Sequence, residues 1–385
     1  MSFGLLSVFI PLYVLAIGGS LVDIGIMVAV ALFLAIPASF FWGYACDKTR
    51  RYKRYILISF LSSAIVLSLF TFTSSILLLT MLYAIMSIFH IAHEPPKNVL
   101  VAELYSREQW GRAFALYEAF TEAGWLVGLA LGFFVSVYGV SSTYTLFLCS
   151  GLNLVALVIS LFLVADPVFL FERGLVSIEK SIDFTYRGVA IASRILDGYT
   201  TNERLKKENL TAICLGLMLF SLATSTLFTP LPVFLSSQLV LPTSIVFAVY
   251  ILNSGAGVAG YIVAGRRSDS TSKKSAINRI VMFRAVLAFA FVGAALVPTY
   301  QVASTALILV LYNFAYALFL VFMLSLTMEL IPAGKSGLFN ALIGAGAAGG
   351  SFIGPFLAEE FGFAYVFIVT GVVFLFSYIV FKVFS

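Results

Sequence analysis

Residues 21–54 read LVDIGIMVAVALFLAIPASFFWGYACDKTRRYKR and join an apolar run to a basic cluster. The first part, residues 22–42, holds one acid near its start and is otherwise uncharged. About 20 apolar residues suffice for a helix to cross the hydrocarbon layer of a bilayer. The second part carries five basic residues, Lys48, Arg50, Arg51, Lys53 and Arg54. An apolar run that ends in such a cluster is typical of a transmembrane helix whose end lies in the cytoplasm.

Runs of this kind continue along the whole chain. Apolar residues make up 61% of the 385 positions and charged residues 11%, whereas a soluble domain carries about 25% charged residues. The apolar runs predict twelve spans near residues 2–17, 22–42, 55–73, 75–102, 111–137, 143–165, 210–238, 243–264, 278–297, 302–328, 337–358 and 363–383. The first is short, so it either begins inside the membrane or lacks an N-terminal extension. We therefore expect an all-α integral membrane protein with twelve transmembrane helices.

The basic residues predict which way the chain is oriented. Of the 23 Lys and Arg residues, all except Lys97 are assigned to the even-numbered loops, their flanks or the C-terminus, with Arg284 beside the eighth loop. The odd-numbered loops hold only acids, Asp23, Glu359 and Glu360. Because basic loops stay in the cytoplasm, we expect a multi-pass plasma-membrane protein with both termini cytoplasmic. The net charge of +5 then reflects topology, and nucleic acid is not an expected partner.

A long polar stretch divides the chain into two halves that resemble each other. We predict an N-terminal six-helix bundle at 1–166, a cytoplasmic central loop at 167–208 and a C-terminal six-helix bundle at 209–385. Two patterns recur 222 residues apart, which indicates an internal repeat. The repeated residues are Gly43 and Asp47 with Gly265 and Asp269, and Gly124, Gly128 and Gly132 with Gly346, Gly350 and Gly354.

These residues resemble motifs of the major facilitator superfamily. Gly43-Tyr-Ala-Cys-Asp47-Lys48-Thr-Arg50-Arg51-Tyr-Lys53-Arg54 is similar to the family's G-x-x-x-D-[RK]-x-G-x-[RK]-[RK] loop. Gly350-x-x-x-Gly354-Pro355 resembles its glycine–proline pattern. The resemblance implies two six-helix bundles related by a pseudo-twofold axis, which move a small solute by alternating access. It also implies a gating role for Gly43, Asp47 and Lys48, with Gly265 and Asp269 as the repeat copy. A carboxylate at a helix end, beside cations and a glycine that allows close approach, would form a breakable latch.

Spans four and five hold the candidate proton-coupling and substrate residues: His90, His93, Glu94, Lys97, Glu118 and Glu122. His90, Glu94 and Lys97 lie at i, i+4 and i+7, so they share a helix face. Counting depth from the cytoplasmic turn predicts a Lys97–Glu118 pair and a separate cluster of Glu94, Glu122 and the histidines. Two nearby carboxylates in a low dielectric cannot both ionise cheaply, so one should hold a proton. The alternative is a static ion pair between two helices, with the histidines in packing roles.

Further residues are predicted to line the cavity or its gate. Pro95 and Pro96 should kink span four beside the ionisable residues. The second half offers only neutral cavity candidates, so we expect a site that is charged in one half and neutral in the other. The cavity candidates are Tyr13, Thr226, Asn253, Asn313, Tyr316 and Asn340. Cytoplasmic gate ion pairs are expected among Glu103, Arg112, Glu329 and Lys335.

The predicted function is secondary active transport of a small organic solute, coupled to protons, by a monomer in the lipid bilayer. No G-x-x-x-x-G-K-[ST] motif occurs, so nucleotide is not an expected partner. No catalytic site is recognised, and the three cysteines show no metal spacing, so we expect no enzyme activity, no metal and no cofactor beyond the proton gradient. Two alternatives stay open: efflux of drugs or hydrophobic compounds by the same fold, and a sensor or scaffold that does not transport.

Overall fold

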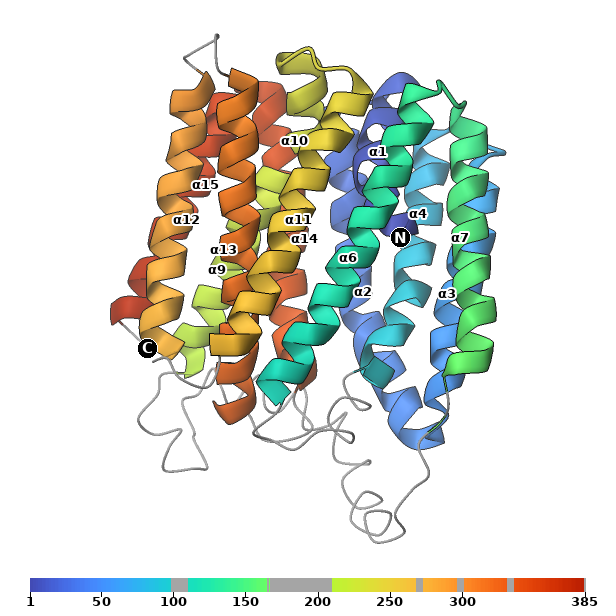
Figure 1. Cartoon of the computed structure of the whole chain (residues 1–385), viewed down its shortest axis with the longest axis horizontal. Helices are drawn as coiled ribbons and strands as arrows, with labels where there is room; N and C mark the ends of the chain where they lie inside the picture. Colours follow the sequence, from blue (N-terminus) through green and yellow to red (C-terminus); the bar gives the residue numbers. More distant parts are fainter. Residues whose placement is uncertain are drawn as a thin grey trace, which may run out of the picture.

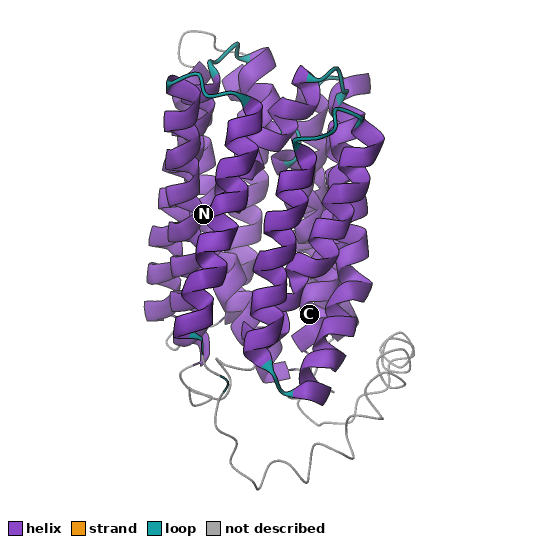
Figure 2. Cartoon of the chain, turned by 90° about the vertical axis from the view of Figure 1, so that its right-hand side faces the viewer, coloured by secondary structure: helices purple, strands orange, loops and turns teal. Residues whose placement is uncertain are grey.

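The computed structural model of this chain is a bundle of membrane-length helices that run side by side (Figures 1 and 2). It describes residues 1–97, 110–164, 166, 210–267, 273–295, 301–330 and 336–383. Within these ranges eleven helices are long and apolar enough to cross a membrane, and a twelfth apolar helix is shorter. The described residues contain helices and connecting turns but no strand. The all-α, twelve-helix prediction is confirmed.

The N-terminal half contributes the first six spans. Its elements are α1 Ser2–Ala16, α2 Leu21–Thr49, α3 Tyr52–Phe70, α4 Ile76–His90, the 3-10 turn η1 Ile91–His93, α6 Trp110–Val137 and α7 Ser142–Leu163. Helix α1 is the short one, and the N-terminus lies at mid-height of the bundle (Figure 1). The start of α2 is fixed by a capping box, in which Ser20 and Asp23 each accept the other's backbone N–H.

The C-terminal half contributes the other six spans. Its elements are α9 Leu210–Phe228, α10 Leu231–Val233, the π-turn η3 Phe234–Gln238, α11 Thr243–Arg267, α12 Lys273–Ala295, α13 Gln301–Leu330, α14 Ser336–Glu360 and α15 Phe363–Val383. Together α9, α10 and η3 form the seventh span. The predicted central loop, 167–208, lies outside the described residues, and the domain boundaries stay a prediction.

Several helices extend past their predicted bounds because charged residues continue a helix beyond its apolar part, and two of these extensions bear on the site. Helix α2 runs to Thr49, so Gly43, Asp47 and Lys48 lie in its last turns and not in a loop. Helix α12 begins at Lys273, five residues before the predicted span. Its bounds place Arg284 at the middle residue of the helix, so the assignment of Arg284 to a loop flank was wrong.

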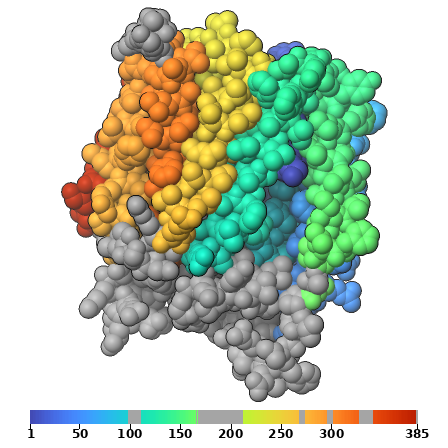
Figure 3. Space-filling view, in the orientation of Figure 1, coloured from blue at the N-terminus to red at the C-terminus, as the bar shows by residue number. Residues whose placement is uncertain are grey.

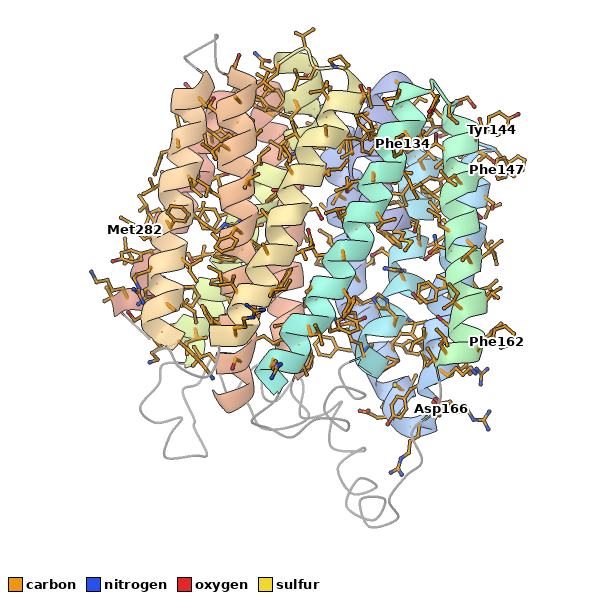
Figure 4. The ribbon with its side chains drawn as sticks, in the orientation of Figure 1. Phe134, Tyr144, Phe147, Phe162, Asp166 and Met282 are labelled. Atoms are coloured by element: carbon orange, nitrogen blue, oxygen red, sulfur yellow. The ribbon has the colours of Figure 1, made fainter. Side chains whose placement is uncertain are left out.

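Large apolar side chains cover the outside of the bundle. Phe134, Tyr144, Phe147, Phe162 and Met282 point outward from the helices, and Phe162 is 83% exposed (Figure 4). Soluble proteins rarely expose so much contiguous apolar surface. The multi-pass membrane prediction therefore agrees with the surface as well as with the helix lengths.

The repeated glycines perform the same task in the two halves. A Cβ at Gly128 of α6 would collide with the backbone of Met1 in front of α1. A Cβ at Gly350 of α14 would collide with the backbone of Leu222 in α9. In each half, glycine thus lets the first helix lie directly against the fifth, and small residues serve this purpose widely in membrane helix packing.

The two halves meet along two seams. One seam joins α6 to α11 and the other joins α2 to α14. The space-filling view shows the α6–α11 seam running across the front of the molecule (Figure 3). On the other seam, a Cβ at Gly25 of α2 would lie 3.1 Å from Pro355 and Ser351 of α14. The candidate site lies along the first of these seams.

Candidate functional site

Helix α4 breaks beside the ionisable residues. It ends at His90, continues as a 3-10 turn through His93, and resumes helical geometry up to Lys97. The break lies just before Pro95 and Pro96, because a proline cannot donate to the carbonyl four residues earlier and its ring clashes with it. The predicted interruption of span four is confirmed.

Lys97 lies between two carboxylates. Its ammonium Nζ is 2.6 Å from Glu94 Oε2 on its own helix and 3.5 Å from Glu118 Oε1 on α6. The Lys97–Glu118 pair predicted by depth is therefore present, and the lysine side chain is only 11% exposed. One cation facing two carboxylates leaves the group one negative charge in excess, which a nearby proton can neutralise.

His93 contacts both the break in α4 and Glu94. Its Nδ1 contacts the His90 carbonyl oxygen, which can only accept a hydrogen bond, so Nδ1 carries a proton. Its Nε2 lies 3.3 Å from Glu94 Oε1. A hydrogen bond at that second contact needs one further proton, on the imidazole or on the carboxyl. His93 thus connects Glu94 to the His90 carbonyl at the break in α4.

His90 has a different environment from the one predicted. Its Nδ1 lies 3.2 Å from Ser59 Oγ, and the Ser59 hydroxyl also contacts the His90 carbonyl at 2.8 Å. The ring packs at 4.0 Å from the ring of Phe3 on α1. His90 lies beside His93, with their ring centres 4.6 Å apart, but its own side-chain hydrogen bonds go to α3 and not to a carboxylate. The packing role that the sequence left open fits these contacts.

Glu122 is bound by the opposite half of the protein. Its Oε1 accepts hydrogen bonds from Ser254 Oγ of α11 at 2.8 Å and from Asn313 Nδ2 of α13 at 3.3 Å. Asn313 Nδ2 also donates to the Asn253 carbonyl at 2.9 Å. The predicted cluster of Glu94 with Glu122 was therefore wrong. We call this set, Glu122 with Ser254 and Asn313, the cross-half junction.

A glycine makes room for the junction. A Cβ at Gly257 of α11 would lie 2.7 Å from Asn313 Nδ2 and 3.0 Å from Glu122 Oε1. The first distance is shorter than real Cβ contacts allow and the second is tighter than most of them, so any larger residue must shift these two side chains. Glu122 is the thirteenth residue of α6, so it lies about 18 Å along the helix from its start at 1.5 Å per residue. The junction therefore lies near the middle of the membrane.

The remaining cavity candidates divide into several environments. Asn313 belongs to the cross-half junction, and Asn253 borders it through its backbone carbonyl. Tyr316 stacks on Phe220 inside the C-terminal half. Thr226 is fully buried and donates to the Leu222 carbonyl of its own helix, so it offers no free polar group. Tyr13 is half-buried and stacks on Phe9, and the side chain of Asn340 lies outside the described residues.

The predicted gate is described only in part. Among the described residues no atom lies within 4 Å of a Cβ placed at Gly43, so none of them makes the close approach expected there. The repeat copy does allow it, since a Cβ at Gly265 would lie 2.9 Å from Ala115 of α6. Asp47, Lys48 and Arg112 are exposed. The backbone of Glu103 and the side chains of Asp269, Glu329 and Lys335 lie outside the described residues.

At the opposite end of the bundle the halves are joined directly. The carboxylate of Glu359, at the end of α14, accepts the backbone N–H of Val22 in the first turn of α2 at 2.8 Å. The free N–H groups of a helix start favour an anion, so this contact is electrostatically favourable. Val233 of α10 also packs into the apolar cluster that contains Leu5 and Leu6 of α1. These contacts close the two halves at the end predicted to face outward.

One charged residue escaped the sequence analysis. Arg284 is fully buried in the C-terminal half, at mid-length of α12. The assignment of every basic residue except Lys97 to a loop, a loop flank or the C-terminus was therefore wrong for Arg284. Helix length would have revealed it, because about 20 residues counted back from the end of α12 put Arg284 near the centre.

Two six-helix halves, packed alike around repeated glycines, agree with the family profile that the sequence matches. Residues 1–355 match the Major Facilitator Superfamily. The chain belongs to this superfamily. Among solved structures, this major facilitator protein is similar to a variant of the nucleoside transporter NupG, with a TM-score of 0.72 and 16% identity over 99% of this chain and 95% of that one. It is also similar to the human organic anion transporter MFSD10, also called TETRAN, with a TM-score of 0.65 and 16% identity over 94% and 83% of the two chains. No curated protein sequence matches it.

Proposed function

We propose that this protein is a proton-coupled secondary active transporter of a small organic solute that works by alternating access. In this proposal it acts in the plasma membrane, as a monomer with both termini in the cytoplasm. The fold supports the general part of the proposal, solute transport, since two of the structures similar to it are described as a nucleoside transporter and an organic anion transporter. Coupling to protons is argued from the site itself.

The observation that supports coupling best is the cross-half junction. Glu122 belongs to α6 of the N-terminal half, and its two donors, Ser254 and Asn313, belong to the C-terminal half. Hydrogen bonds to a charged group contribute about 1.5–3 kcal/mol, and bonds between neutral groups about 0.5–1.5 kcal/mol. Protonation of Glu122 therefore weakens a link that holds the halves together at mid-depth. In this proposal the Glu122 carboxylate both binds the proton and helps to hold the two halves together.

The His93–Glu94 pair supplies a second site for a proton. Glu94 is linked to Glu118 through Lys97, and Glu118 lies one helical turn from Glu122 on α6. The five groups therefore form a row from the break in α4 to the seam between the halves. In the proposed cycle, a proton is passed from the His93–Glu94 pair along this row to Glu122. Its arrival there weakens the cross-half junction.

The outer contacts support alternating access in the same way. The link between Val22 and Glu359 and the packing of Val233 against α1 close the outward end. The Val22–Glu359 hydrogen bond is exposed, and single polar contacts at the surface are weak. In the proposed cycle these contacts open when the cytoplasmic end of the bundle closes.

The proposal is tested with purified protein in liposomes. Uptake of radiolabelled nucleosides and organic anions is measured with and without an imposed pH gradient, for the native chain, Glu122→Gln and the control Glu360→Gln. Glu360 is an exposed carboxylate at the far end of α14. We expect a substrate that accumulates only with the gradient, loss of accumulation in Glu122→Gln, and native behaviour in the control. Uptake that ignores the gradient in the native chain would contradict proton coupling.

A further inference from the structure

Arg284 is a charged residue in the membrane interior, and no described residue neutralises its charge. It is fully buried at the middle of the 23-residue helix α12. No carboxylate forms a salt bridge with it in the described part of the chain, and its Nε, Nη1 and Nη2 atoms have no hydrogen-bond partner there. An unpaired charge at this depth is energetically costly, and such groups usually mark a functional site.

Aromatic rings from three helices surround the guanidinium. Its carbon lies 3.8 Å from the ring centre of Tyr312, 4.7 Å from that of Phe220, 4.9 Å from that of Phe374 and 5.3 Å from that of Tyr316. Cation–π contacts of this kind compensate part of the charge. Ring faces do not, however, provide acceptors for the N–H groups in the guanidinium plane, and a buried donor without an acceptor costs about 1–3 kcal/mol.

Other hydrogen-bond donors in the same core also lack partners. The Tyr312 hydroxyl is buried without a partner, and so is the Thr370 hydroxyl, one turn before Phe374 on α15. The core of the C-terminal half therefore combines a positive charge with several free donors, and no carboxylate is among its described residues. The group that satisfies this combination is a compact anion, because it supplies both the negative charge and the acceptors.

We propose that Arg284 binds a small anion inside the C-terminal six-helix bundle. The ligand is a halide or a compact oxyanion, and it has two possible sources: a free inorganic anion, or the anionic group of the transported solute. Helix α13 connects this site to the cross-half junction. Tyr312 and Tyr316, whose rings face the guanidinium, lie on either side of Asn313 in the sequence of this helix, and Asn313 donates to Glu122. An anion bound here therefore acts on the same helix that holds the junction.

The site is tested by thermal unfolding of the purified protein in a bulky sulfonate buffer. Chloride, nitrate, phosphate, acetate, benzoate and a nucleoside monophosphate are titrated separately. The variants are Arg284→Met and Arg279→Gln, the latter an exposed arginine on the same helix that serves as the matched control. A ligand that binds only the native state raises the unfolding temperature with concentration.

The native chain and Arg279→Gln should show a saturable rise in unfolding temperature with at least one anion. In Arg284→Met the half-saturating concentration should increase at least 30-fold, because removing one partner of a buried charge pair costs 2 kcal/mol or more. Without added anion, Arg284→Met should be as stable as the native chain or more stable, since an apolar residue then replaces an unpaired charge.

Stabilisation by chloride, nitrate or phosphate would identify a free inorganic anion as the ligand. Stabilisation by the organic anions alone would identify the anionic group of the solute. If no anion stabilises the native chain in an Arg284-dependent way, the proposal is overturned, and the aromatic rings alone hold the guanidinium. Because the readout is stability, this result is independent of proton-coupled transport.

Discussion

The substitution Glu122→Gln should loosen the contact between the halves to a measurable extent. Glutamine keeps the shape and an acceptor oxygen, but it removes the negative charge that Ser254 and Asn313 face at 2.8 and 3.3 Å. The shorter bond should weaken by about 1 kcal/mol, the difference between a charge-assisted and a neutral hydrogen bond, and the longer bond by about half of that. The sum of about 1.5 kcal/mol corresponds to a roughly 10-fold shift in the balance between joined and separated halves.

The shift can be followed with one spin label on each side of the seam. Leu116 of α6 and Ile262 of α11 are 53% and 44% exposed, so they tolerate labelled cysteines after the three native cysteines are replaced. In the native background, lowering the pH should lengthen the distance between the labels as Glu122 gains a proton. In Glu122→Gln the longer distance should dominate at every pH. If the variant keeps the native distances and their pH dependence, Glu122 does not control the contact.

Three further substitutions test neighbouring parts of the structure. Lys97→Met leaves two facing carboxylates without their cation, so the unfolding temperature should fall at neutral pH by the equivalent of about 3–5 kcal/mol. It should recover at lower pH, because the carboxylates then protonate. An unchanged unfolding temperature at neutral pH would contradict this. Gly257→Ala adds a methyl group inside the junction and should reproduce the distance change of the Glu122 variant, whereas native distances would show that the junction adapts. Gly350→Val should destabilise the protein by about 1–3 kcal/mol or more through overpacking. The control Gly151→Val should not, because no atom lies within 4 Å of a Cβ at that position. Equal stabilities of the two variants would contradict the packing role of the repeated glycines.

Local patterns in the sequence were enough to predict the helices and one ion pair. Apolar length determines where a span can form, because every backbone polar group in the membrane must be satisfied within its own helix. The Lys97–Glu118 pair was found because span four and span five are consecutive, so depth could be counted from one turn. The same count failed for Glu94 and Glu122, since it gives depth but not the direction in which a side chain points.

The partners of Glu122 could not be found by this reasoning. Ser254 and Asn313 are 132 and 191 residues away, and their contact depends on how the two halves pack. Arg284 was missed for another reason. A window of hydropathy ends at charged residues, so the first turns of α12 were assigned to a loop, and the arginine at mid-helix was assigned with them.

Proton release on ligand binding tests the central claim most directly. The purified protein is mixed with nucleosides and organic anions in a weakly buffered solution, and the pH change is compared between the native chain and Glu122→Gln, with binding measured in parallel. The account predicts that a ligand that binds both proteins changes the pH only with the native chain. Binding to the native chain without any proton release or uptake would contradict coupling and favour a uniporter or a sensor.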